Sequence, residues 1–205
     1  MAVALNKTTL KQQRDQLKTF KRFLPSLDLK RQQLLAALKQ TRKERDDINL
    51  AYVECQTRLE QIYPLLGSST VATRNLASLV RIRAVKVGQQ NLLGTTLPVA
   101  EQVEFDVANY SRLVMPFWVD LLVENLQQLA TLNVKLQVFD ERVALLEAAA
   151  RKITQRVNLF EKVLIPQADS NIRKIVIFLS DQERAAVVRS KIAKRKNAGM
   201  RPERL

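Results

Sequence analysis

Residues 129–164 read LATLNVKLQVFDERVALLEAAARKITQRVNLFEKVL, and this stretch decides the fold. Its apolar side chains recur alternately three and four residues apart, at the a and d positions of a seven-residue repeat. Continued to residue 167, 11 of the 12 a and d positions are apolar: Leu129, Leu132, Leu136, Phe139, Val143, Leu146, Ala150, Ile153, Val157, Phe160, Leu164 and Gln167. A period of 3.5 residues predicts a long helix that packs along a narrow seam against another helix.

The first third of the chain carries the same repeat. Of its 17 a and d positions 13 are apolar: Leu10, Gln13, Leu17, Phe20, Leu24, Leu27, Arg31, Leu34, Leu38, Thr41, Arg45, Ile48, Tyr52, Cys55, Leu59, Ile62 and Leu66. The two helices are each other's simplest partners, in an antiparallel hairpin of helices. A parallel dimer is the alternative, although it would bring Arg31 and Arg45 of two chains face to face. We assign the seam to Leu27, Leu34, Leu38, Ile48, Leu59, Leu136, Phe139, Val143, Leu146, Ile153, Val157 and Phe160.

Two prolines lie within these helices. The repeat continues through Pro25, and apolar spacing resumes after Pro166 at Ile172 and Ile175. We therefore expect each proline to kink its helix rather than end it. The alternative at Pro25 is a break between two shorter helices.

The middle of the chain has a different pattern. Gly67, with the serines after it, ends the first helix, and residues 70–79 suit a short helix. Residues 80–87 and 103–107 have strand character; Gly88 is expected to close the first strand, and a loop is expected over 91–98. A two-stranded ribbon is marginal alone, so it must lean on the helices or on another protein. The second long helix is expected to begin between residues 109 and 116.

These patterns predict a mainly α protein. Its fold is a long antiparallel two-helix coiled coil formed by the N- and C-terminal helices, with a small middle segment that contains a short helix and a β-hairpin. The division is an N-terminal helix over 1–66, a middle cap over 67–115, a C-terminal helix over 116–189 and a basic tail over 190–205.

The composition argues against an enzyme. The chain has no His and one Cys, which removes the commonest general base and metal ligand, and its 4 Gly form no phosphate-binding loop. Cys55 lies at a d position and is expected to be a buried structural thiol, and Trp118 to be core. No cofactor and no metal site are expected. A reducing, cytoplasmic setting without a signal peptide or membrane span is predicted.

The formal net charge is +14, and residues 184–205 hold eight Lys or Arg and one acidic residue. Such a tail suits nucleic acid, an anionic surface or plain solvation. A basic structural or nucleic-acid-binding coiled coil and a homodimeric scaffold are therefore rival hypotheses, although few aromatics lie among the basic residues. A second apolar stripe comprises Val134, Val138, Leu145 and Leu159. It suits either contact with the middle segment or docking of another subunit.

Three segments resemble the D subunit of the V-type and A-type ATPases. The most specific is Arg156-Val157-Asn158 followed by Ile165-Pro166. The others are Leu27, Lys30, Arg31 and Leu34 in one run, and Asn91, Gly94 and Pro98 in the other. The resemblance covers nearly the whole chain and departs at Pro25, where many members have a glycine-containing stretch.

The resemblance implies a non-catalytic central rotor shaft. Such a shaft inserts its coiled coil into a hexamer of catalytic A and non-catalytic B subunits, binds a small F-like subunit, and meets the membrane ring through an adaptor subunit. It couples ATP hydrolysis or synthesis in the hexamer to proton or sodium transport. The resemblance would place residues 5–24 and 172–205 inside the hexamer.

Overall fold

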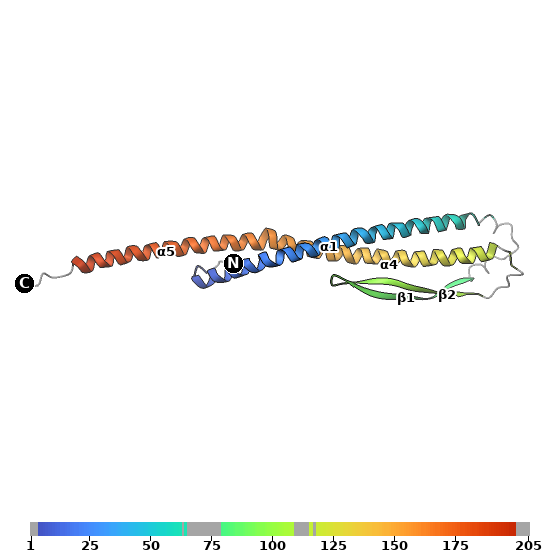
Figure 1. The fold of residues 1–205 in the computed structure, drawn as a ribbon, viewed down its shortest axis with the longest axis horizontal. Coiled ribbons are helices and arrows are strands. Elements are labelled where there is room, and N and C mark those ends of the chain that lie inside the picture. Colours follow the sequence, from blue (N-terminus) through green and yellow to red (C-terminus); the bar gives the residue numbers. More distant parts are fainter. Residues whose placement is uncertain (1–3, 63, 65–78, 109–114, 117, 200–205) are drawn as a thin grey trace, which may run out of the picture. The chain divides into compact units, whose positions relative to one another are not determined.

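The structure, a computed structural model, describes residues 4–62, 64, 79–108, 115–116 and 118–199 (Figure 1). Its elements are α1 (Lys7–Glu60), β1 (Val80–Leu92), β2 (Thr95–Val107), α4 (Trp118–Leu159), the π-helix η1 (Phe160–Leu164) and α5 (Ile165–Gly199). The predicted fold class is confirmed: the protein is mainly α, with long N- and C-terminal helices and an antiparallel hairpin between them. The short helix predicted over 70–79 falls almost wholly outside the described residues.

The chain divides into two compact units, one of residues 30–152 and one of residues 1–29 with 153–205. Both α1 and the helices after residue 118 contribute to each unit.

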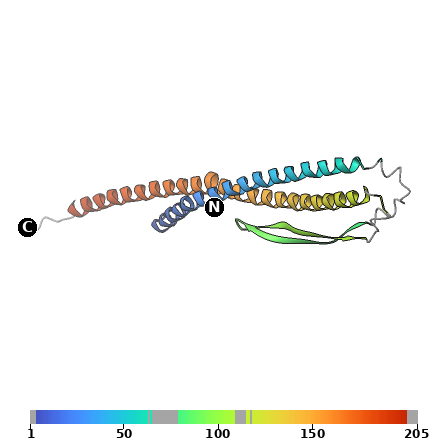
Figure 2. The same cartoon turned by 45° about the vertical axis from the view of Figure 1, so that its right-hand side comes forward.

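In the unit of residues 30–152, α1 pairs with α4 in antiparallel fashion. Arg42 contacts Glu147, Arg45 contacts Asp140, and Cys55 contacts the backbone of Asn125, so that position advances along α1 as it recedes along α4. Figures 1 and 2 show the two helices side by side, with the hairpin lying along α4.

The open end of this helix pair is closed by a hydrophobic cluster. Its buried members are Leu59, Ile62, Leu79, Trp118, Val119, Leu122 and Val123. Burial of an aromatic or large aliphatic side chain contributes about 1.5–3 kcal/mol. Trp118 is 5% exposed, which confirms its expected place in the core.

The hairpin strands are longer than predicted. β1 continues through Gly88 to Leu92, and β2 begins at Thr95, so the expected closure at Gly88 and the loop over 91–98 are wrong. The connection is a two-residue turn, in which Leu93 and Gly94 both have positive φ (53° and 80°), as type I′ hairpin turns require. The N–H of Gly94 donates to Asn91 Oδ1 over 2.9 Å. The second half of β1 was not predicted because Gln89, Gln90 and Asn91 are polar, and all three are exposed in the strand.

In the unit of residues 1–29 and 153–205, α1 is antiparallel to η1 and α5. The Phe20 ring contacts the Phe160 ring edge to face, with centroids 5.4 Å apart. Asn171 Nδ2 donates to Gln13 Oε1 over 3.4 Å, and Lys7 Nζ lies 3.6 Å from Glu183 Oε1.

The two prolines end neither helix. Pro25 lies inside α1, which runs unbroken through it, so the alternative of two shorter helices is wrong. Pro166 is the second residue of α5, directly after η1. The start predicted for the second long helix was slightly early, since α4 begins at Trp118.

Candidate functional site

None of the predicted seam residues is exposed. Leu34, Leu38, Leu59, Leu146, Ile153 and Val157 are buried, and Leu27, Ile48, Leu136, Phe139, Val143 and Phe160 are half-buried. Leu146 is fully buried, whereas its neighbour Leu145 is 37% exposed. The contrast between adjacent leucines shows how narrow the buried stripe is on α4.

Cys55 and Asn125 fix the pairing near the cluster end of the unit. The Cys55 thiol is fully buried and donates to the backbone oxygen of Asn125 over 3.6 Å, which confirms the expected structural thiol. The Asn125 side chain, 7% exposed, donates through Nδ2 to Leu121 O over 2.7 Å. This amide therefore enters the core with a hydrogen-bond partner, as buried polar groups must.

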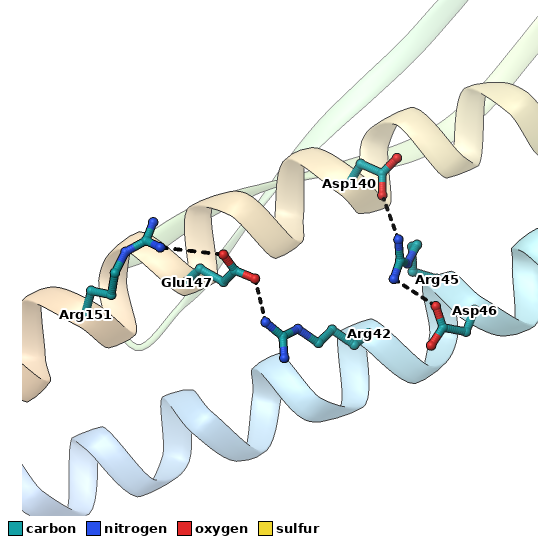
Figure 3. Close-up of polar contacts among 6 residues, drawn as sticks. All are labelled: Arg42, Arg45, Asp46, Asp140, Glu147 and Arg151. Atoms are coloured by element: carbon teal, nitrogen blue, oxygen red, sulfur yellow. Dashed lines mark hydrogen bonds and ion pairs between the residues drawn. The ribbon is translucent and has the colours of Figure 1, made fainter.

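A strong ion pair crosses from α1 to α4 beside the seam (Figure 3). Arg42 Nη2 donates to Glu147 Oε1 over 2.6 Å, and Arg151 Nη1 lies 3.7 Å from Glu147 Oε2. The hydrogen bond from Arg42, with the charges of Arg42 and Arg151, holds the pKa of the Glu147 carboxyl below its usual value. Both cations therefore favour the charged form of Glu147.

Arg45 makes a second crossing one turn along α1. Its Nη1 lies 3.6 Å from Asp140 Oδ1, and its Nη2 lies 2.9 Å from Asp46 Oδ1. The predicted repeat gave Arg45 an inward a position without a partner. The signal for both crossings was present in the sequence, because Arg42, Asp140 and Glu147 each follow an a or d position and so flank the seam.

Two motif residues, Gly94 in the hairpin turn and Lys30 in α1, lie close together. A Cβ added at Gly94 in the hairpin turn would lie 3.7 Å from Lys30 Nζ. Pro98 is half-buried, and Leu97 beside it is 1% exposed, so this end of the hairpin is packed down. Two segments more than 60 residues apart in sequence are thereby brought together at Lys30.

The remaining motif residues lie in the helices, except for Asn91, which lies in β1. Leu34 is buried, Leu27 and Arg31 are half-buried, and Asn91 is exposed in β1. In the C-terminal motif, Val157 is buried, Asn158 and Ile165 are half-buried, and Arg156 and Pro166 are exposed.

The second apolar stripe is split by its surroundings. Val138 is 8% exposed and Val134 is half-buried, so these two are covered within the chain. Leu145 and Leu159 are 37% and 47% exposed. The uncovered part of the stripe is therefore confined to these two leucines.

The basic end of α5 is exposed along its whole described length. Every described side chain from residue 181 to 197 is exposed, including the apolar Val187, Val188 and Ile192. A shallow hollow of about 550 Å³ is lined by Val188, Ile192 and three cations, namely Lys191, Lys194 and Arg195. This segment therefore presents apolar groups flanked by positive charge.

Within the described part of the chain, no cluster of three or more acidic or cysteine side chains is placed to hold a metal ion. None of the helices described here carries an apolar run long enough to cross a membrane.

The fold defines a mainly α protein built on paired long helices with an inserted β-hairpin. A model of the ATP synthase D subunit family matches residues 9–195. A V-type ATP synthase D subunit of Borreliella burgdorferi is 36% identical over 192 residues, which cover 94% of this chain and 93% of the relative. Proteins of the same name from Chlamydia felis and Chlamydia pneumoniae are 32% and 30% identical, over 95% of this chain and 93% and 92% of the relatives.

The chain therefore belongs to the ATP synthase D subunit family, and the resemblance noted in its sequence is confirmed.

Proposed function

We propose that the chain is the non-catalytic central-stalk subunit, the rotor shaft, of a V/A-type rotary ATPase. It couples ATP hydrolysis or synthesis in the catalytic hexamer to proton or sodium transport across the membrane. The match to the D subunit family over residues 9–195 carries this proposal. The antiparallel helix pairing supports it, because a shaft must transmit torque without unwinding.

The paired helices suit that task mechanically. Packed apolar seams resist shear between helices since interiors are close-packed and poorly compressible. The Arg42–Glu147 and Arg45–Asp140 crossings add further fixed points between α1 and α4. A pair of unlike helices has no threefold symmetry, so three equivalent catalytic sites around it meet three different surfaces. Nucleotide state then biases shaft angle and shaft angle biases nucleotide affinity, which is the reciprocity of linkage.

The partners follow from the same proposal. They are the catalytic A and non-catalytic B subunits of the hexamer, a small F-like stalk subunit and an adaptor subunit that leads to the membrane ring; no nucleic acid is involved. The protein is placed in the cytoplasm, peripheral to the membrane. The division of the chain into an N-terminal helix (1–66), a middle cap (67–115), a C-terminal helix (116–189) and a basic tail (190–205) is part of this proposal. The exposed Leu145 and Leu159 are candidates for docking a stalk partner.

A cross-linking experiment separates a rotor from a static subunit. Ser190 lies in the exposed basic end of α5, so a Ser190→Cys variant of the intact complex offers a single accessible thiol on this chain, because Cys55 is buried. Linking this thiol covalently to the surrounding hexamer should abolish ATP turnover, and cleavage of a reducible linker should restore it. Full turnover with the link in place would contradict the rotor role.

A truncation tests the basic end directly. We expect a chain that ends after Arg189 to lose ATP-driven ion pumping while the complex keeps hydrolysing ATP. The reason is that the removed segment carries the exposed cations of the hollow on α5. Unchanged pumping per ATP would show that this segment is only a solvated tail.

A further inference from the structure

The buried side of α5 does not continue the repeat that precedes it. In the same unit, Ile153 and Val157 are buried at d and a positions, at 5% and 2% exposure. An unbroken repeat would next place Gln167 and Lys174 at d positions, yet both are exposed. The buried residues are one position later, at Ala168 (4%) and Ile175 (0%).

The same shift by one residue is seen at the a positions, where burial is divided between each a residue and the residue after it. Each a residue of the unbroken repeat and its successor are both half-buried: Leu164 with Ile165, Asn171 with Ile172, and Phe178 with Leu179. The helix therefore carries two overlapping registers one residue apart. In the later register the d positions are apolar, and in the earlier one they are polar, so burial favours the later register.

The π-helix η1 provides the extra residue. The N–H of Ile165 donates to Phe160 O, five residues back, where a regular α-helix would bond four residues back. This wide turn takes up one residue, so Ala168 and Ile175 reach the side that faces α1. Without the wide turn, the one extra residue would rotate the following part of the helix by about 100° about its axis.

Pro166 explains why the wide turn lies at this point. A proline has no N–H to donate, and in a regular α-helix its ring clashes with the carbonyl four residues back, here that of Lys162. The π-helix ends at Leu164, two residues before the proline, so the carbonyl that would clash belongs to the wide turn. Pro166 thus favours the wide turn here over any other place on the helix.

We propose that η1, positioned by Pro166, sets the rotational phase of α5 about its own axis and so selects the side chains that α5 presents to other subunits. With Ile175 turned inward, Lys174 and Ile177 face outward, the latter 62% exposed. In the earlier register, Lys174 would enter the seam and Ile175 would leave it. The identity of the subunits that meet this face rests on the proposed rotor function.

Two variants distinguish the effect of the rotational phase of α5 from the effect of the π-helix itself. Both also carry Pro166→Ala, so that the proline does not prevent a regular α-helix. The first deletes the exposed Glu161, which restores the seven-residue spacing and leaves the outward face of α5 unchanged. The second keeps every residue but moves the apolar d positions back by one, with Gln167→Ala, Ala168→Gln, Lys174→Ile and Ile175→Lys. Both should form a straight helix, and only the second should turn the outward face, by about 100°.

The phase is measured by thiol labelling of an added Ile172→Cys, since residue 172 is half-buried in the observed register. Labelling should be slow in the Pro166→Ala parent and in the deletion variant, and at least tenfold faster in the shifted variant. In the reconstituted ATPase, the deletion variant should pump ions like its parent, and the shifted variant should lose pumping at least tenfold.

Two results would overturn the proposal: slow labelling in the shifted variant, or pumping by the shifted variant equal to that of the deletion variant. Failure of the wild-type chain to join an ATPase complex at all would instead contradict the rotor function. The labelling result stands independently of that outcome, because it needs only the isolated chain.

Discussion

In the unit of residues 30–152, ion pairs join the two helices across the seam and a hairpin flanks them. In the other unit, the ion pair between the helices is longer and more exposed. Arg42 and Glu147 meet at 2.6 Å in the first unit, but Lys7 and Glu183 lie 3.6 Å apart with exposed side chains in the second. Beyond Glu183, α5 has only exposed side chains as far as residue 197. Both units expose some large apolar side chains, but the long stretch of α5 in which every described side chain is exposed belongs to the second unit.

The largest effect should come from the seam of the first unit. Leu146→Ala removes a fully buried side chain and should lower the free energy of unfolding by about 2–5 kcal/mol. Urea unfolding followed by circular dichroism measures the change. Leu145→Ala is the matched control, because that neighbour is 37% exposed and should lose far less. Equal losses at the two leucines would mean that the seam does not carry the stability of this unit.

The aromatic contact of the second unit should contribute less. Phe20→Leu keeps an apolar side chain but removes the edge-to-face contact with Phe160, which is worth about 0.5–1.5 kcal/mol. Phe23→Leu serves as the control, since Phe23 is 53% exposed. If Phe23→Leu destabilised the chain as much as Phe20→Leu, the difference between inner and outer faces would be wrong for this unit.

The seven-residue repeat was enough to predict the fold class, because a period of 3.5 depends only on which positions are apolar. It predicted long N- and C-terminal helices and placed Leu34 and Leu146 on their inner sides. The strand ends were missed because residues 89–91 are polar on an exposed strand and Pro98 reads as a loop residue. The side chains of residues 89–91 and of Pro98 do not indicate the backbone pairing between β1 and β2 that extends the hairpin.

The π-helix was missed for a different reason. A seven-residue repeat assumes that every residue turns the helix by the same angle. One extra residue therefore places the polar Gln167 at a d position, and the repeat of apolar residues ends there. The signal was the eight-residue spacing from Phe160 to Ala168, followed by Ile175. The repeat placed Asp140 beside the seam but did not pair it with Arg45, because that pairing depends on how α1 and α4 are aligned along their length.

The crossing at Glu147 should make the first unit sensitive to acid. Arg42 holds the pKa of Glu147 below its unfolded value, so this stabilisation is present above the unfolded pKa and is lost as the pH falls through the folded pKa. Wild type should therefore exceed Glu147→Gln in stability at pH 7 and lose that advantage at strongly acidic pH. Unfolding at a series of pH values measures it, with Glu183→Gln as the exposed control. An advantage that grew toward acid would contradict the assigned direction.

The smallest effect should come from the exposed pair of the second unit. Lys7 and Glu183 are 79% and 70% exposed, so water screens their attraction, and such pairs contribute about 0–1 kcal/mol. A double-mutant cycle with Lys7→Ala and Glu183→Ala measures the coupling, and 0.5 M salt should reduce it further because screening shortens to a few ångströms (~4 Å). The same cycle on Arg42 and Glu147 should give a larger coupling, since their hydrogen bond is shorter and their side chains are less exposed. The reverse order would remove the distinction between the two units, because the second would then hold its helices together by charge as firmly as the first.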